Sequence, residues 1–416
     1  MNSTAQRRGA ALPAGSAQSR EPRPARQTMK AIVQDHYGSQ DVLQLRDIDK
    51  PVVGDEEVLI RVHAAGLHIG DWHFMTGLPY MLRIAGFGVL APKIHVRGMD
   101  VAGTVEAAGQ NVTLFQTGDQ IFGTCDGSFA EYACGGQDKF ALKPKNVSFE
   151  HAADVPTYGF AALQGLRDKG KIQPGRKVLT VGASEGVGTF AVQIAKFFGA
   201  EVTGVCSAKN VDMVRSVGAD QVIDYTQEGF TETEQRYDLI LEMGGRRSLS
   251  DIRRALRPRG HLVLVGAEGG GRWLGGTDRW IRALRVSPFV GQTLGPLATM
   301  PRKADLEFLK NLIQAGKVTP VIDRTYAMGE VPEAFRFLEN EKARGKVVSV
   351  VATCRQSQIS TMRRDTYAAG ARLANSVAIT APTPAPWPHS EPGCKHVHDC
   401  IEKHTFGGDS QSVSPS

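Results

Sequence analysis

Cysteine is scarce in this chain of 416 residues, and long apolar runs are absent. The six cysteines are scattered along the sequence, which excludes a disulfide-stapled scaffold and favours a reducing compartment. No apolar stretch approaches the roughly 20 residues that a membrane-spanning helix needs. With 41% hydrophobic residues, the chain nevertheless has enough apolar side chains to bury sizeable cores. We therefore expect a folded, cytoplasmic protein with no membrane span.

A concentrated basic face is missing as well. The formal net charge is +6, but residues 1–28 alone hold five arginines against one glutamate. Residues 29–352 hold 38 basic and 37 acidic side chains and are close to neutral. Because nucleic-acid binding needs a clustered positive surface, this balance argues against nucleic acid as a partner. We expect a small-molecule substrate instead.

Both ends of the chain lack the apolar residues that a core needs. Residues 1–28 are rich in Ala, Arg, Ser and Pro, and residues 353–416 are polar with four alternating prolines. We predict that both segments are disordered. An arginine-rich, acid-poor start is also typical of organelle transit peptides, but glycines and prolines would interrupt the amphipathic helix of such a signal. The tail motif Cys394-x-His-x-His-x-Cys400 lacks the usual spacing of a zinc site, and we assign no metal to it.

The central region changes its pattern near residue 155. Residues 29–155 contain short stretches with alternating apolar and polar side chains, such as Val58–Ala64, separated by glycines. This pattern predicts a compact β-rich domain. From 156 to 299, apolar strands such as Lys177–Val181 alternate with helical patterns such as Thr189–Phe198. This alternation predicts a doubly wound parallel sheet, and hence an α/β protein. Residues 300–352 add two helices and a closing strand, at Ala304–Ala315, Val331–Glu341 and Lys346–Val351.

A glycine-rich loop joins the first strand of this sheet to its first helix. The predicted phosphate-binding residues are Gly182, Ala183, Ser184, Glu185, Gly186, Val187 and Gly188. Main-chain N–H groups at a helix N-terminus, together with the helix dipole, bind a pyrophosphate. Glu185 occupies the position of the middle glycine in G-x-G-x-x-G, where a carboxylate is unfavourable unless it points to solvent. The alternative is a strand–turn–helix that binds nothing, and the surrounding βαβ pattern argues against it.

The second strand of the sheet lacks the acid that would bind the ribose 2′-hydroxyl of NAD. It is followed instead by Ser207 and Lys209, which suit a 2′-phosphate by hydrogen bond and by charge. Tyr225 ends the third strand and is expected in the same adenosine pocket. We therefore predict NADPH as the cofactor, the alternative being that Lys209 is a solvated surface residue. Further cofactor contacts are expected where the fourth and fifth strands end, at Gly244 and Gly266.

Six motifs along residues 29–352 resemble one protein family. They are Ala65–Trp72, Arg97–Val105, Phe115–Asp119, Gly182–Gly188, Gly218–Tyr225 and Arg344–Val348. In order and spacing they resemble the medium-chain dehydrogenase/reductase superfamily, in its zinc-independent quinone-oxidoreductase-like branch. The resemblance implies a GroES-like catalytic domain over 29–155, a Rossmann domain over 156–299, and a return to the catalytic domain over 300–352. It also implies that Lys346 touches the cofactor, and that the chain forms a homodimer through the Rossmann domain as relatives often do.

The zinc ligands of the superfamily's alcohol dehydrogenases are missing. Those enzymes carry Cys where this chain has His68 and a His-Glu pair where it has Met99 and Asp100. Their third ligand is Cys or His, in the region that reads Pro156–Gly159 here. Methionine is a poor zinc ligand, and a catalytic site needs three protein ligands. We therefore expect no metal.

The resemblance implies hydride transfer to a quinone or an α,β-unsaturated carbonyl compound. A conjugated acceptor is easier to reduce without a metal, because negative charge spreads onto its oxygen. The catalytic candidates are His68, Asp71 and Tyr80, with Tyr158 as a further donor. His68, where relatives usually carry Asn, either donates a hydrogen bond or proton to the developing enolate or is a structural histidine bonded to Asp71. The stretch Tyr80–His95 is expected to be a mobile loop.

Two other functions remain open. One is a metal-free, NADP-dependent alcohol dehydrogenase, which would oxidise simple alcohols. The other is a non-catalytic nucleotide-binding redox sensor, which would bind NADPH without turning it over. Glu185, inside the phosphate loop, is the residue that most favours the second alternative.

Overall fold

The computed structural model describes residues 27–232, 234–244, 247–266, 271–341 and 346–350. The expectations for residues 1–28 and 353–416 therefore lie outside the described residues, apart from the last two residues of the first segment. No helix in the described ranges is both long enough and apolar enough to cross a bilayer.

The first sheet is mixed and has the order β14-β15-β3-β4-β5-β7, with β6 paired to β3. Its strands are β3 (Glu57–Leu67), β4 (Asp100–Ala108), β5 (Gln120–Thr124), β6 (Tyr132–Gly136), β7 (Phe140–Leu142), β14 (Ile322–Ala327) and β15 (Lys346–Val350). A separate hairpin pairs β1 (Thr28–Val33) with β2 (Gln44–Asp49). Strand β15 runs antiparallel to β3, with Val347 opposite Leu67. The end of the globular region thus returns to the sheet built by its beginning.

The second sheet is parallel and has the order β10-β9-β8-β11-β12-β13. Its strands are β8 (Lys177–Val181), β9 (Glu201–Cys206), β10 (Gln221–Asp224), β11 (Tyr237–Glu242), β12 (Leu256–Leu264) and β13 (Thr293–Pro296). The order reverses between β8 and β11, because the chain first builds outward on one side of β8 and then on the other. Ligands of such sheets bind at this switch point, beyond the carboxyl ends of the strands.

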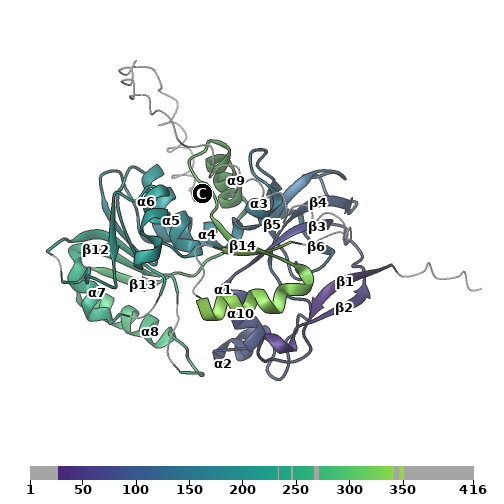
Figure 1. Ribbon diagram of the computed structural model, residues 1–416, viewed down its shortest axis with the longest axis horizontal. Helices are drawn as coiled ribbons and strands as arrows, with labels where there is room; N and C mark the ends of the chain where they lie inside the picture. The colour runs from purple at the N-terminus through teal and green to yellow at the C-terminus, as the bar shows by residue number, and fades with distance from the viewer. Residues whose placement is uncertain (1–26, 233, 245–246, 267–270, 342–345, 351–416) are drawn as a thin grey trace, which may run out of the picture. The chain divides into compact units, whose positions relative to one another are not determined.

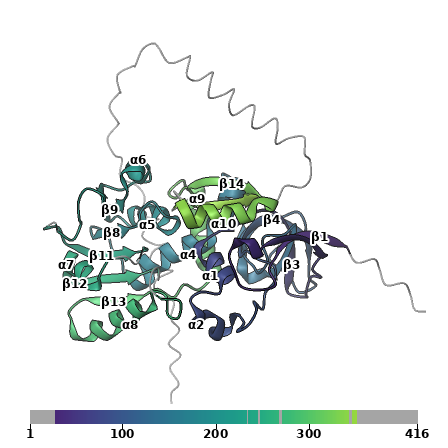
Figure 2. The same cartoon turned by 60° about the horizontal axis from the view of Figure 1, so that its bottom comes forward.

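Helices cover both faces of the parallel sheet (Figures 1 and 2). One face packs against α5 (Gly186–Phe197) and α6 (Val211–Ser216), and the other against α7 (Leu249–Ala255) and α8 (Thr277–Val286). Alternate residues of a strand enter different cores, as Val178 and Leu179 do in β8. Burial on both faces explains why these strands are almost continuously apolar. The α/β fold predicted from the sequence, with a GroES-like domain and a Rossmann domain, is confirmed.

Among the α-helices and strands of residues 156–299, α4 (Pro156–Gln164), α8 and β13 were not predicted from the sequence. Helix α5 also begins at Gly186, three residues earlier than expected, because its first turn contains two glycines whose helical state depends on packing. The expected loop Tyr80–His95 contains a short helix, α2 (Tyr80–Leu82), and a π-helical turn, η2 (Arg83–Phe87). The Tyr80 N–H donates to the Arg272 carbonyl oxygen at 2.8 Å and thereby joins this stretch to the segment before α8.

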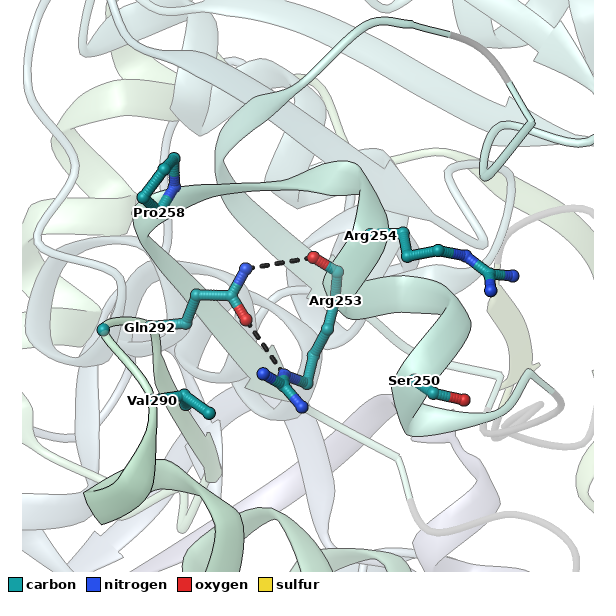
Figure 3. A pocket seen from close by; sticks show the side chains of 7 residues that line it. Ser250, Arg253, Arg254, Pro258, Val290 and Gln292 are labelled. Atoms are coloured by element: carbon teal, nitrogen blue, oxygen red, sulfur yellow. Dashed lines mark hydrogen bonds between the residues drawn. The ribbon is translucent and has the colours of Figure 1, made fainter.

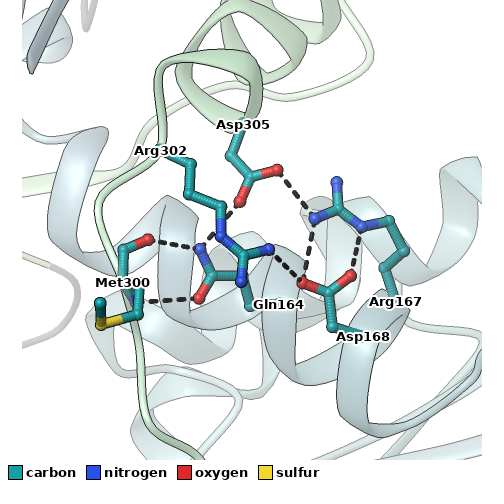
Figure 4. Close-up of polar contacts among 6 residues, drawn as sticks. All are labelled: Gln164, Arg167, Asp168, Met300, Arg302 and Asp305. Carbon is teal, nitrogen blue, oxygen red and sulfur yellow. Dashed lines mark hydrogen bonds and ion pairs between the residues drawn. The ribbon is translucent and has the colours of Figure 1, made fainter. Parts of the chain in front are cut away.

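A buried polar network ties α4 to α9 (Lys303–Gln314), as Figure 4 shows. The Asp305 carboxylate, 3% exposed, accepts from Gln164 Nε2 and from Arg167, each at 2.8 Å. Gln164 also bonds to the main chain of Met300 through both its amide atoms. Because the partners of the buried carboxylate are charged or well directed, the network fixes the position of α4. This matters for the site, since the first turn of α4 lies next to the catalytic candidates.

Candidate active site

The phosphate loop has the geometry of an anion-binding turn. Gly182 has φ +87°, a conformation that glycine adopts without strain. A Cβ on Gly188 would lie 2.1 Å from the Gly182 carbonyl oxygen, so glycine is required there for α5 to approach β8. The N–H groups of Gly182 and Ala183 donate to Val205 of β9 at 3.1 and 3.0 Å. The loop is therefore held against the sheet, with the α5 N-terminus above the switch point.

Glu185 is the N-cap residue of α5 but makes no side-chain cap. Its side chain is exposed, as a phosphate site requires, although its carboxyl atoms lie 3.2–3.3 Å from where a Cβ on Gly182 would be. The backbone cradle thus fits a nucleotide pyrophosphate, because a helix N-terminus and a close glycine approach are both present. The Glu185 carboxylate would repel that pyrophosphate unless it turns outward.

A second hydrogen-bonded group lies at the carboxyl end of β9. The amide of Asn210, 4% exposed, donates to Ser184 Oγ at 3.0 Å and to Ser207 Oγ at 3.5 Å. Lys209 is exposed beside it, and the Tyr225 N–H donates to Cys206 of the same strand at 3.1 Å. The structure thus brings the phosphate loop and the predicted 2′-phosphate residues together. Asn210 was missed because a single asparagine after a strand carries no distinctive pattern.

The remaining predicted cofactor contacts are Gly244, Gly266 and Lys346. Gly244 follows β11 and faces open space, whereas a Cβ on Gly266, after β12, would lie 2.0 Å from the Met243 carbonyl oxygen. At the same end of the sheet the buried Glu242 forms an ion pair with Arg279 of α8. This pair was missed because α8 itself was not predicted. Lys346 pairs through its backbone with β14, and nothing is described of its side chain.

His68 and Asp71 form a reciprocal cap at the start of α1 (Ile69–Thr76). The Asp71 N–H donates to His68 Nδ1 at 3.3 Å, and the His68 N–H donates to Asp71 Oδ2 at 3.0 Å. The two side chains are 3% and 2% exposed. Since Nδ1 accepts, the ring proton is assigned to Nε2, which has no hydrogen-bond partner among the described residues. The structural contact with Asp71 is therefore present, and Nε2 itself lies 3.5 Å from Asp71 Oδ2, beyond the distance of a good hydrogen bond.

A buried arginine stands near this cap. Arg97 is 7% exposed, and burial lowers the pKa of its guanidinium while the charges of Asp71 and Tyr37 oppose that shift. A buried carboxylate needs such a counter-charge, because an isolated ion is costly in a low-dielectric interior. Arg97 belongs to one of the motifs that carried the family resemblance. Its role next to Asp71 could not be derived from the sequence, since 26 positions separate the two residues.

The positions that correspond to zinc ligands are engaged in hydrogen bonds. Asp100 is fully buried and accepts from the Thr157 N–H at 3.1 Å and from Thr157 Oγ1 at 2.6 Å, through different carboxylate oxygens. Thr157 stands in the first turn of α4, where zinc enzymes were expected to supply a Cys or His. Within the described ranges, no three His, Cys, Asp or Glu side chains are grouped as metal ligands. The donor set at this position does not fit a catalytic zinc.

The third catalytic candidate, Tyr80, makes a different set of contacts. Its ring packs edge-on against Trp273, with ring centres 5.3 Å apart, and the Arg83 guanidinium lies over it at 4.8 Å. His73 of α1 hydrogen-bonds through Nδ1 to the Leu78 carbonyl oxygen at 2.8 Å. Burial lowers the pKa of His73. The structure thus joins His68 to Asp71 and places the Tyr80 ring against the segment before α8.

A surface pocket of about 450 Å³ lies elsewhere on the parallel sheet domain. Figure 3 shows Arg253 of α7 and Gln292 bonded to each other across it, with Nε donating to Oε1 at 3.0 Å. Pro258 and Gln292 lie near the amino ends of β12 and β13. The pocket is therefore at the opposite end of the strands from the phosphate loop, and we do not assign the cofactor to it.

Comparison with known proteins agrees with this architecture. Residues 54–145 match the alcohol dehydrogenase GroES-like domain, and residues 217–348 match the model described as zinc-binding dehydrogenase. The mitochondrial NAD(P)H oxidoreductase RTN4IP1 of Mus musculus is 30% identical over 78% of this chain and 89% of its own length. A 2-methylene-furan-3-one reductase of Solanum lycopersicum is 32% identical over 77% of this chain and 78% of its own length.

A solved structure gives the same result. The quinone oxidoreductase from Coxiella burnetii is 28% identical, with a TM-score of 0.67 over 78% of this chain and all of that one. The predicted resemblance is confirmed by these matches. The chain belongs to the medium-chain dehydrogenase/reductase superfamily, in its quinone-oxidoreductase-like branch, and is an NAD(P)H-dependent oxidoreductase.

Proposed function

We propose that this enzyme transfers hydride from NADPH to a quinone or an α,β-unsaturated carbonyl compound without zinc. The observation that carries the proposal is the engagement of Asp100 by Thr157 through both carboxylate oxygens. Asp100 and Thr157 stand in two of the three segments that supply the zinc ligands in zinc alcohol dehydrogenases, and here they bind each other instead. Without a Lewis acid, an acceptor that spreads charge through conjugation is the better substrate.

The preference for NADPH rests on the end of β9. Ser207 is held by Asn210, and Lys209, two residues further along the chain, is exposed. This pair suits a 2′-phosphate, whereas a carboxylate at this position would favour the 2′-hydroxyl of NADH. We include Gly182–Gly188, Tyr225, Gly244, Gly266 and Lys346 in the proposed cofactor site.

The proposed chemistry asks little of the protein beyond positioning. The bound cofactor supplies the hydride, and the protein orients the acceptor and stabilises the charge that develops on its oxygen. His68 Nε2 is the donor we propose for that oxygen, because it is buried and makes no hydrogen bond among the described residues. Asp71 fixes the ring by accepting from the His68 main chain and donating its own N–H to Nδ1. We propose Asp71 as a positioning residue. We propose Tyr80 as a part of the acceptor site, together with the segment before α8 against which its ring packs.

The decisive test is an activity screen of the full chain. We expect saturable NADPH consumption with 1,4-quinones or 2-alkenals, little activity with simple alcohols and NADP, and at least tenfold poorer kcat/KM with NADH. Prior treatment with a chelator should leave the rates unchanged. Activity that is lost on chelation and restored by zinc would overturn the metal-free part of the proposal. Oxidation of simple alcohols would point instead to an alcohol dehydrogenase.

A second candidate is favoured by one observation, the Glu185 carboxyl group over Gly182. A chain that binds the nucleotide weakly, or binds it without turnover, would be a nucleotide-binding sensor. Fluorescence titration of NADPH separates the two functions. Tight binding with no turnover of any conjugated acceptor would support the sensor.

We also propose a cytoplasmic homodimer. Strand β13 is an edge of the parallel sheet, and in the described residues it pairs only with β12. Light scattering of the full chain should give twice the chain mass, and the mass of a single chain would contradict the dimer. Imaging of a tagged chain tests the location.

A further inference from the structure

The first turn of α4 contacts both the phosphate loop and the catalytic candidates. Tyr158 is 8% exposed, and a Cβ on Gly186 would lie 2.0–2.6 Å from three of its ring atoms. Gly186 is the first residue of α5 and does not have a positive φ. Glycine is therefore required at this position by the neighbouring ring and not by the backbone conformation.

The other end of the same side chain reaches α1. The Tyr158 oxygen accepts a hydrogen bond from the main-chain N–H of Ile69, the residue that follows His68. The Tyr158 ring also lies edge-on to the His68 ring, with centres 6.2 Å apart. Burial, together with Asp154, Asp71 and Asp100, raises the pKa of Tyr158 well above its ordinary value, so the phenol stays protonated.

The preceding residue of the same turn explains why Tyr158 cannot move independently. Thr157 is bonded twice to the buried Asp100 of β4, and the far end of α4 is fixed through Gln164. The tyrosine is therefore held in place from both sides and packs between two helix N-termini. A displacement of the α5 N-terminus acts on its ring, and its hydroxyl acts on the first N–H of α1.

We propose that Tyr158 is a positioning residue that couples occupation of the phosphate loop to the orientation of His68. The inference rests on the proposed use of the α5 N-terminus as the cofactor site. Binding of the nucleotide at α5 fixes Gly186 against the ring, the ring fixes the phenol oxygen, and the oxygen fixes the start of α1. His68 Nε2 is then presented to the acceptor in one orientation.

Hydrogen exchange of the full chain with and without NADPH tests the coupling independently of turnover. In the wild type, NADPH should slow amide exchange in a peptide covering α1 by about fivefold. Tyr158→Phe keeps the ring on Gly186 but loses the bond to Ile69. It should bind NADPH within twofold of the wild type, show no slowing in α1, and lose about tenfold in kcat. Tyr132→Phe, on β6, should behave as the wild type.

A double-mutant cycle tests the ring contact. Gly186→Ala should weaken NADPH binding at least tenfold in the wild type but have little effect in Tyr158→Ala, where the ring is gone. An equal loss in both backgrounds would mean that the nucleotide, not Tyr158, requires the glycine, and would overturn the coupling. The coupling would also be overturned if NADPH slowed amide exchange in α1 of Tyr158→Phe as much as in the wild type. That result stands even if Tyr158→Ala fails to fold. Absence of NADPH binding to the wild type would instead refute the proposed function.

Discussion

Two helix N-termini lie on either side of Tyr158, and the protein treats them in opposite ways. At α1 the chain itself provides hydrogen-bond partners at the N-terminus, through the reciprocal cap of His68 and Asp71. At α5 the N-cap residue, Glu185, makes no side-chain cap, and the first turn is built from glycines. Every helix start carries N–H groups without a partner inside the helix. One set is thus used for structure, and the other is the set that we propose binds the nucleotide.

We expect the largest effect from a substitution that pushes the α5 N-terminus away from the sheet. In Gly188→Ala, the new Cβ would meet the Gly182 backbone at 2.1 Å, where no flexible side chain can yield. We expect a loss of about 3 kcal/mol in the free energy of unfolding, or failure to fold. Urea denaturation measures it, with Gly244→Ala, which adds its Cβ to open space, as the control. Equal midpoints for the two variants would contradict the close approach.

At the α1 N-terminus, two substitutions of His68 distinguish its role as a helix cap from its proposed role as a donor to the acceptor. His68→Ala removes both and should lose about 1 kcal/mol of stability, as other N-cap deletions do. His68→Asn keeps a capping side chain and should retain most of that stability. If the ring donates to the acceptor, both variants should lose about 10²-fold in kcat. Wild-type kcat in His68→Asn would remove the imidazole from the mechanism.

Substitution of Lys209 tests the proposed contact with the 2′-phosphate of NADPH. Removing its charge in Lys209→Ala should weaken NADPH binding about tenfold, which is about 1.4 kcal/mol, and leave NADH binding unchanged. Fluorescence titration of both nucleotides measures this. Lys303→Ala, on α9, is the matched control for loss of a lysine. A parallel loss for both nucleotides would show that Lys209 does not contact the 2′-phosphate.

Glu185 gives a smaller effect of opposite sign. Glu185→Gln removes a carboxylate from beside Gly182 and should tighten NADPH binding about fivefold at low salt. The gain should shrink as ionic strength rises, because salt screens exposed charges. Weaker binding in the variant would indicate that the carboxylate helps to hold the nucleotide.

The smallest effect concerns His73, which lies on α1 beside the cap. Burial holds its folded pKa below the ordinary value of 6.5. The unfolded chain therefore takes up a proton at higher pH than the folded protein does. Stability should fall as the pH drops below about 6.5, with a slope of at most about 1.4 kcal/mol per pH unit from this group. His73→Gln should reduce that slope in denaturation curves recorded between pH 7 and pH 5.

The phosphate loop could be predicted because its signal is local. A strand, a glycine-rich turn and a helix follow one another within about 20 residues, and the chemistry follows from that order. The cap of His68 by Asp71 also had a local signal, the three-residue spacing of a capping box. Helix α8 was not predicted, although its apolar residues Trp280, Ala283 and Leu284 recur at helical spacing. The buried pair of Glu242 and Arg279 was missed with it.

The contacts that complete the site are not local. Arg97 precedes β4, yet its charge interacts with that of Asp71 on α1, and Asp100 meets Thr157 across 57 positions. Tyr158 was only a further candidate donor in the sequence, and nothing there connected it to Gly186. Such contacts arise when two sheets and the helix between them pack, and no periodicity records them.

The sequence by itself determined the class of fold and the strand–turn–helix of the loop that we propose binds phosphate, because each depends on neighbours within one βαβ unit. The tertiary structure alone decided how the two helix starts are used. Asp100 is engaged by Thr157, the Glu185 carboxyl group lies beside Gly182, and Tyr158 packs between the two termini. These outcomes depend on distances between segments remote in the chain, which packing sets and composition does not.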